Sequence, residues 1–185
     1  MGVPNFSAQA LPTTLNTENG RAQILDWKVG EVTYSLACVF LSMGNPHVIL
    51  RVEELKSFPV EKLGPIIEND PRFPKRINCN FMSLNGNTIC LRTWERGAGE
   101  TLACGTGATA TVVGALCNQW LAFPAKSAKE TDLLGKEENL ISLKVAGGIL
   151  KVHWGGPNHP AYLTGPCKIV FSGTFSLPFF ERKNP

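Results

Sequence analysis

Cys104 is the residue of this sequence best suited to do chemistry. It stands between two glycine-rich runs in ERGAGETLACGTGATATVVGAL, residues 95–116, just before a stretch with helical spacing. A cysteine in the first turn of a helix faces unpaired backbone N–H groups and the positive end of the helix dipole, and both favour thiolate over thiol. Because Gly105 and Gly107 have no side chains, a carboxylate could approach the same N–H groups closely. The segment therefore predicts a reactive sulfur beside an anion-binding site.

Other interpretations of this segment stay open on the residues alone. GTGATA, residues 105–110, matches the dinucleotide-binding pattern G-x-G-x-x-A, but the run ERGAGETLA precedes it where that motif needs a buried apolar strand. A cysteine protease would need a histidine beside Cys104, and the sequence does not say whether His47, His153 or His159 lies there. A buried cysteine in a glycine-rich turn, with no catalytic role, also fits the pattern.

The spacing of the cysteines indicates neither a zinc site nor a redox pair. The sequence has six cysteines, and no two of them stand at C-x-x-C spacing. We therefore expect reduced thiols and no metal centre. Cys38, Cys90 and Cys117 lie among apolar residues, where cysteine usually acts as a small buried hydrophobic residue. The other two are Cys79 and Cys167.

Composition and charge narrow the class of partner. The 185 residues are 43% hydrophobic, as in ordinary globular proteins, and 18 basic and 15 acidic side chains give a net charge of +3. These charges are mixed along the chain without a lysine and arginine block, so no nucleic-acid partner is expected. The first residues, MGVPNFSAQALP, have neither the basic nor the apolar region of a signal peptide. We expect a cytoplasmic protein with no membrane partner.

The elements that would position Cys104 are mostly strands. Runs rich in β-branched and aromatic residues, bounded by Gly, Pro or Asn, predict six or more strands. These runs cover residues 22–29, 32–43, 47–52, 86–96, 140–154 and 167–177. A short helix is expected to start at Pro59 within residues 59–70, although Pro65 limits its regularity.

A longer helix is predicted within residues 107–121, directly after Cys104. Four apolar residues stand at helical spacing and could bury one face of it: Ala108, Val112, Ala115 and Leu116. The polar and charged run 122–139 then predicts a solvated loop. The expected fold class is α+β, with a β-rich sheet around one central helix.

The run ERGAGETLACGTGA, residues 95–108, closely resembles the signature around the second active-site cysteine of the diaminopimelate epimerase family. These enzymes epimerise an amino acid of lysine and cell-wall biosynthesis without a cofactor. The similarity continues, in the family's order, through MGVPNF at 1–6, SMGNPHVIL at 42–50, ENDPRFPKRINCNFM at 68–82 and GPNHPAYLTGP at 156–166. Together these runs span nearly the whole chain.

The resemblance implies a role for each matching residue. Cys104 is implied to be one of two cysteines that exchange the α-proton, and Gly105 and Thr106 to contact the substrate. The positions that match the family's other substrate-binding residues are Asn45, Asn78, Glu95 and Arg96. His47 and Glu95 match residues thought to adjust the cysteine pKa values. On chemical grounds alone, the two asparagines could be turn residues, and Glu95 with Arg96 a surface ion pair.

The activity implied by the resemblance is the interconversion of LL- and meso-diaminopimelate, with no cofactor and no metal, by an enzyme that is a homodimer when complete. Removing an α-proton without pyridoxal phosphate needs a strong base in a dry site, with the carboxylate charge offset by fixed N–H dipoles. Inversion also needs a proton donor on the opposite face. One cysteine therefore acts as base while a second acts as acid, and the expected partner is the small-molecule substrate diaminopimelate.

The family's fold has two similar α+β domains with the substrate between them, and this sequence resembles the second. We assign residues 1–167 to that domain, and residues 168–185 to a terminal strand and tail that pack on the first domain. The family's first cysteine lies in a Cys-Gly-Asn-Gly motif, and none of the cysteines here is followed by Gly-Asn-Gly. We expect the chain alone to be inactive. Thr109 stands where the family often has a cysteine, a change expected to affect packing.

Two alternatives remain. A proline-racemase-like or phenazine-biosynthesis-like isomerase would share the fold, and the long match over ERGAGETLACGTG disfavours it. A non-catalytic binding or assembly module would keep half a site, with Cys104 in it, and perform no reaction.

Overall fold

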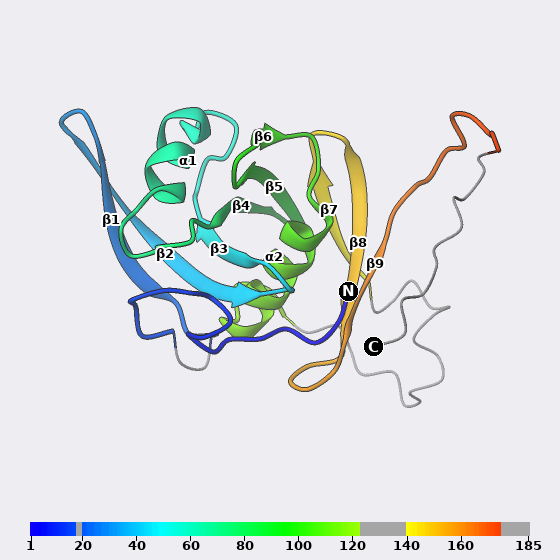
Figure 1. Ribbon diagram of the computed structural model, residues 1–185, viewed down its shortest axis with the longest axis horizontal. Helices are drawn as coiled ribbons and strands as arrows, with labels where there is room; N and C mark the ends of the chain where they lie inside the picture. The colour runs from blue at the N-terminus through cyan, green and yellow to red at the C-terminus, as the bar shows by residue number, and fades with distance from the viewer. Residues whose placement is uncertain (18–19, 123–139, 175–185) are drawn as a thin grey trace, which may run out of the picture.

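A nine-stranded mixed β-sheet and two helices form the part of the chain described by the computed structural model, residues 1–17, 20–122 and 140–174 (Figure 1). In chain order the elements are β1 (Gln23–Val29), β2 (Val32–Ser42), β3 (Pro46–Arg51), α1 (Val60–Glu68), β4 (Asn78–Asn85), β5 (Thr88–Glu95), β6 (Gly99–Thr101), α2 (Gly105–Cys117), β7 (Ile141–Val145), β8 (Gly148–Trp154) and β9 (Ala161–Thr164). The strands lie in the order β1-β2-β3-β4-β5-β7-β8-β9, and β6 pairs with β5 beside this path.

Each helix lies on a crossover between parallel strands. β3 pairs with β4 and β5 pairs with β7 in parallel, whereas the other neighbouring strands are antiparallel. Parallel neighbours cannot be joined by a tight turn, so the chain must leave the sheet and return. α1 occupies the connection from β3 to β4, and α2 occupies the connection that leads from β5 through β6 to β7.

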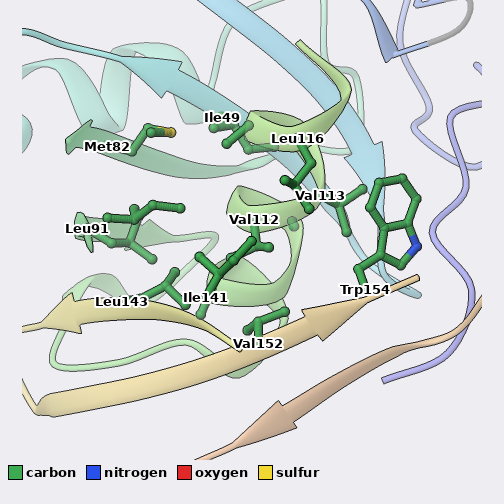
Figure 2. Close-up of a cluster of buried hydrophobic side chains, with 14 of the residues drawn as sticks. Ile49, Met82, Leu91, Val112, Val113, Leu116, Ile141, Leu143, Val152 and Trp154 are labelled. Carbon is green, nitrogen blue, oxygen red and sulfur yellow. The ribbon is translucent and has the colours of Figure 1, made fainter. Parts of the chain in front are cut away.

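The sheet curves around α2, the green helix near the centre of Figure 1. This helix packs against strands on both sides, β2 to β5 and β8 with β9, and residues 107–116 are all buried. In Figure 2, side chains of α2 lie between those of β3 to β5 and those of β7 and β8; the labelled residues are Val112, Val113, Leu116, Ile49, Met82, Leu91, Ile141, Leu143, Val152 and Trp154. The face predicted to be buried is buried, and burial extends to the other faces of the helix because strands close over it all round.

α1 covers the opposite face of the sheet, and the strands between the two helices alternate their side chains between two cores. In β2, Val39 and Leu41 belong to the core around α2, whereas Cys38 and Phe40 belong to the core beneath α1. Residues i and i+2 of a strand share a face. Polar residues on the α2 face of β3, β4 and β5 are therefore aimed toward that helix.

The predicted α+β class is confirmed, and most predicted elements form. α2 begins at Gly105, two residues before the predicted run, and the sequence predicts none of β4, β6 and β9. β4, NCNFMSLN, alternates polar and apolar residues except at Phe81–Met82, but its polar positions carry asparagines, which are depleted in strands. None of the helices in the described ranges is long and apolar enough to cross a membrane.

The predicted terminal strand, 167–177, does not form over residues 167–174. That segment lacks strand pairing and exposes three large apolar side chains, Ile169, Val170 and Phe171. The remainder of the predicted strand, the tail to residue 185 and residues 123–139 of the predicted loop lie outside the described residues.

Candidate active site

Cys104 caps the N-terminus of α2. Its backbone is extended, with φ −126° and ψ 113°, and its sulfur accepts a hydrogen bond from the backbone N–H of Gly107 at 3.4 Å. The hydroxyl of Thr106 lies 3.5 Å from the same sulfur. The first N–H groups of a helix have no partner within it, and here the sulfur takes the place of the oxygen of a Ser or Asp cap. The predicted position of Cys104 at a helix start is confirmed.

The protonation state of Cys104 differs from the expectation. The residue is only 6% exposed, and this burial raises the pKa of the thiol above its ordinary value. Hydrogen bonds from Thr106 and from the Gly107 N–H act to lower the pKa, but burial outweighs them, and Glu95 raises the pKa further. The helix terminus acts in the expected direction through the Gly107 N–H, but burial has the larger effect, so the net shift of the Cys104 pKa is upward.

Glu95, the last residue of β5, is the acidic neighbour of Cys104. Its carboxylate accepts a hydrogen bond from the hydroxyl of Thr101 at 2.6 Å, and its proximity raises the pKa of the Cys104 thiol. Arg96, the next residue, turns its guanidinium to the backbone carbonyl of Lys75, to which it donates at 2.8 Å. Glu95 thus faces the sulfur, and the surface ion pair with Arg96 that the sequence left open is not formed.

A buried histidine connects to Cys104 through two side chains. His47 Nε2 lies 3.0 Å from Asn45 Oδ1, and Asn45 Nδ2 donates to Thr106 Oγ1 at 3.3 Å. His47 is fully buried, and burial together with the nearby charge of Arg96 lowers its pKa to about 3. The imidazole is therefore neutral at pH 7 and acts on the sulfur at a distance, which does not support the Cys–His pair of a protease.

Asn78, at the start of β4, joins the segments that carry the other site residues. Its Nδ2 donates to the carbonyl of Pro46 at 2.8 Å, and its Oδ1 accepts from the backbone N–H of Arg96 at 2.9 Å. The buried amide therefore holds the start of β3 beside the turn after β5. The structure brings the predicted site residues into one neighbourhood, which comprises Cys104, Gly105, Thr106, Asn45, His47, Asn78, Glu95 and Arg96.

These residues all fall within the part of the chain that carries a family pattern. The sequence pattern described as "Diaminopimelate epimerase" matches residues 39–170, which is most of the chain. The chain belongs to this family.

Curated relatives named diaminopimelate epimerase match much of this chain. The relative from Pseudomonas syringae pv. tomato is 39% identical over 178 residues, which cover 96% of this chain and 57% of the relative. The relative from Halorhodospira halophila is 43% identical over 146 residues, or 78% of this chain and 45% of the relative. The chain spans about half the length of the curated relatives it matches. A solved phenazine biosynthesis protein of the PhzF family from Enterococcus faecalis is 20% identical with a TM-score of 0.40, covering 60% of this chain and 34% of that one.

Two glycines of this diaminopimelate epimerase family member let other side chains approach α2. A Cβ at Gly107 would lie 2.3 Å from Asn80 Oδ1, and a Cβ at Gly105 would lie 3.1 Å from Leu163 Cδ2. The sequence predicts that both positions leave room for a carboxylate. At Gly107 that space is filled by Asn80 instead.

Thr109, which stands within α2, donates a hydrogen bond from its hydroxyl to the carbonyl of Gly105 at 2.9 Å.

The sequence analysis missed a buried carboxylate, Glu68, which is hydrogen-bonded to the turn beside the site. Glu68, at the end of α1, is 5% exposed and accepts hydrogen bonds from Arg76 Nη1 at 3.0 Å, Trp94 Nε1 at 2.8 Å and the Gly97 N–H at 2.8 Å. It therefore fixes the turn that follows Glu95. The sequence holds no local signal for this role, because its partners come from segments far apart along the chain.

Asn80 in β4 is the other residue that was missed. It is fully buried and lies on the same strand face as Asn78. Its amide contacts His47 Nδ1 at 3.1 Å and Thr93 Oγ1 at 3.2 Å. The i, i+2 spacing of the two asparagines in INCNF could have indicated it, had β4 been recognised as a strand.

The other cysteines divide by position in the fold. Cys38 and Cys79 are buried, and burial raises the pKa of both thiols. Cys90 is half-buried, whereas Cys117 and Cys167 are exposed. The predicted burial of Cys38 is confirmed. The prediction for Cys117 is wrong, because it is the last residue of α2, where the helix leaves the core.

The strand that a dinucleotide-binding motif needs before its helix does not form ahead of α2 in this family member. β6, the strand before α2, is three half-buried residues long, and Leu102 after it is 72% exposed, so the buried strand of a dinucleotide fold is missing there. Within residues 1–17, 20–122 and 140–174, no three His, Cys, Asp or Glu side chains are grouped to hold a metal ion.

Proposed function

We propose that this chain supplies one of the two acid/base groups of a diaminopimelate epimerase, and that Cys104 is that group. The observation that carries the proposal is the buried Cys104 thiol at the start of α2, between Glu95 on one side and Thr106 with Gly107 on the other. Membership of the family and the names of the relatives support the reaction and the substrate. The need for free thiols suits a reducing compartment such as the cytoplasm.

Epimerisation exchanges one proton at an α-carbon. A base on one face removes the α-proton, which leaves the bonding electron pair on carbon, and an acid on the opposite face returns a proton. In one direction Cys104 is the acid: its S–H bond breaks, a new C–H bond forms, and the sulfur remains as thiolate. In the reverse direction that thiolate is the base. The opposing group is proposed to be a second cysteine from another part of the complete protein.

The surroundings of Cys104 suit both halves of this cycle. Burial and Glu95 favour the thiol before proton transfer, whereas Thr106 and the Gly107 N–H stabilise the thiolate that remains afterwards. A thiolate with little water around it is also a stronger base than one in bulk solvent. The same residue can therefore donate and accept without a change of fold.

The carboxylate beside the α-carbon needs fixed positive partners, because charge builds up there as the proton leaves. The backbone N–H groups of Gly105 and Thr106 lie in the first turn of α2, where the helix dipole adds to their effect. Arg96 uses one guanidinium N–H on a backbone carbonyl and retains others for the far carboxylate of the substrate. Asn45 and Asn78 complete the proposed binding set.

The exposed segment 168–174 is proposed to bind another surface of the complete enzyme. Ile169, Val170 and Phe171 are 88%, 80% and 84% exposed, which is unusual for three consecutive large apolar residues. Either the remaining domain of the enzyme or a second copy in a homodimer would cover them. Residues 1–167 then form the domain that carries Cys104.

Proton exchange in deuterated water tests the proposed reaction. The chain alone, and a chimera in which it replaces the matching part of the Pseudomonas syringae relative, are incubated with LL-diaminopimelate, and α-proton exchange and stereoinversion are followed by NMR. We expect inversion by the folded chimera and none by the chain alone, because a single thiol covers one face. Cys104→Ser should abolish inversion, while Cys117→Ser, at an exposed cysteine of the same helix, should leave it intact.

Two results would count against this function. Full inversion by a Cys104→Ser chimera would remove Cys104 from the reaction. A chimera that folds, binds diaminopimelate and exchanges no proton would favour a non-catalytic module with half a site.

A further inference from the structure

The polar side chains between β5 and α2 form one continuous row. Thr93 Oγ1 lies 3.2 Å from Asn80 Oδ1, and Asn80 Nδ2 lies 3.1 Å from His47 Nδ1. The row continues from His47 Nε2 to Asn45 and Thr106 and ends on the sulfur of Cys104. Its interior members are fully enclosed, since Asn80 and His47 are 0% exposed and Thr93 is 3% exposed.

We propose that Asn80 is the positioning residue that holds His47 as its Nε2–H tautomer and thereby directs this row of hydrogen bonds toward Cys104. The proposal deepens the function proposed above, on which its role in proton exchange depends. Asn80 is hydrogen-bonded to His47 and acts on the sulfur through it.

The direction of the row follows from one backbone carbonyl. Asn80 Nδ2 also donates to the carbonyl of Val48 at 3.2 Å, and a carbonyl oxygen can only accept. The amide nitrogen must therefore face His47, and the amide oxygen must face the hydroxyl of Thr93, which donates to it. Because Asn80 offers N–H to His47 Nδ1, that ring nitrogen has to be the one without hydrogen.

Each later step is then fixed in turn. His47 carries its hydrogen on Nε2 and donates to Asn45 Oδ1, so Asn45 presents Nδ2 to Thr106. That N–H occupies a lone pair of the Thr106 oxygen, which leaves the hydroxyl hydrogen for the sulfur of Cys104. With the opposite tautomer every member would reverse, and the hydroxyl would donate to Asn45 instead of to the sulfur.

Packing holds Asn80 in this orientation. Its Oδ1 fills the space beside Gly107, where even a methyl group would come within 2.3 Å. The low pKa of His47, about 3, keeps the ring neutral, so a single hydrogen must be shared between its two nitrogens. Gly107 therefore has two roles. Its backbone N–H donates to the sulfur of Cys104, and its lack of a side chain leaves the space that Asn80 occupies.

The test begins with the tautomer of His47 in the full 15N-labelled chain, read from long-range 15N–1H correlation spectra at pH 8 and assigned with His47→Gln. We expect hydrogen on Nε2 and none on Nδ1. Asn80→Asp keeps the shape of the side chain, and its carboxylate, once ionised, has no hydrogen to give, so the hydrogen should then move to Nδ1. Asn85→Asp, at the exposed end of the same strand, is the matched control and should change nothing.

The second readout is the rate of Cys104 alkylation by iodoacetamide against pH, followed by mass spectrometry. Loss of the Thr106 donor should raise the apparent pKa of the thiol by about one unit and slow the reaction near neutral pH about tenfold. Thr93→Val introduces no charge and removes the hydroxyl that orients Asn80, so it should give mixed tautomers and a smaller slowing. This variant separates hydrogen-bond direction from the charge of the aspartate.

Neither readout needs epimerase activity, so this proposal can fail while the proposed function stands. An Nδ1–H tautomer in the unmodified chain would overturn it directly, whether or not the variants fold. So would Asn80→Asp and Thr93→Val proteins in which both the tautomer and the alkylation rate match those of Asn85→Asp.

Discussion

At the scale of single residues, His47 links the site to the stability of the fold. Its imidazole is fully buried in β3 and uses both ring nitrogens on asparagine amides. Taking a second proton would place a charge in a region without water and break one of these hydrogen bonds. The folded protein therefore holds the pKa of His47 at about 3, against an ordinary value of 6.5.

This difference makes acid destabilise the protein well above the range in which carboxylates titrate. Between pH 6.5 and about 3 the unfolded chain binds a proton at His47 and the folded chain does not, so the free energy of unfolding falls as the pH falls. From pH 7 to pH 5 the loss from this one group is about 2 kcal/mol. Urea denaturation at both values should show His47→Gln losing that much less than the unmodified chain. His159→Gln, at the surface, is the control, and equal losses in all three proteins would contradict the prediction.

Residue type and spacing predicted where Cys104 stands but not its protonation. A cysteine directly before a run with helical spacing was expected to lie at the helix start, and it does. The direction of its pKa shift depends on how completely the sheet closes over α2, which local spacing does not determine. For the same reason Asn80 and Glu68 were missed, since each acts on segments distant in sequence.

At the scale of elements, the glycines of α2 differ in how much space surrounds them. At Gly107 a Cβ would lie 2.3 Å from Asn80 Oδ1 and 3.3 Å from the sulfur of Cys104. At Gly114, in the middle of the same helix, the nearest atom would be Ile49 Cγ1 at 3.4 Å, an ordinary contact. The start of α2 therefore has no spare room, whereas its middle can take a methyl group.

Substituting alanine at each position should separate these two parts of α2. Gly107→Ala should lower the free energy of unfolding by about 1–3 kcal/mol, because Asn80 or the helix must shift. Gly114→Ala should be neutral or stabilising by up to about 1 kcal/mol, since alanine favours helix. Urea denaturation of both variants measures the difference. Equal effects would mean that Asn80 moves aside freely, which would also weaken its proposed positioning role.

The sequence predicted those helices and strands whose apolar residues recur at regular helical or strand spacing. The strongly apolar and β-branched strands β2, β3 and β5 were found, as was the start of α1 at Pro59. β4 was not, because its buried α2 face carries asparagines where a core strand would carry aliphatic side chains. β4, whose buried face lacks the usual aliphatic side chains at two positions, is the strand that supplies Asn78 and Asn80 to the site.

At the scale of the whole molecule, the sheet closes around α2 and leaves residues 168–174 outside both cores. This segment was predicted as a strand from its β-branched and aromatic residues, but a strand needs a neighbour to pair with. The residue types show that the segment has a high β-propensity, but they do not show which strand it would pair with. An apolar, unpaired segment of this kind favours association with another surface.

We therefore expect the isolated chain to self-associate through this segment. Sedimentation velocity over a dilution series should show dimers or larger species for the unmodified chain, and a monomer for the double variant Ile169→Ser with Phe171→Ser, which removes two side chains that are 88% and 84% exposed. Ile24→Ser, at a 66% exposed residue of β1, is the control and should associate like the unmodified chain. An unmodified chain that stays monomeric throughout, or a double variant that associates equally well, would mean that this segment does not drive self-association.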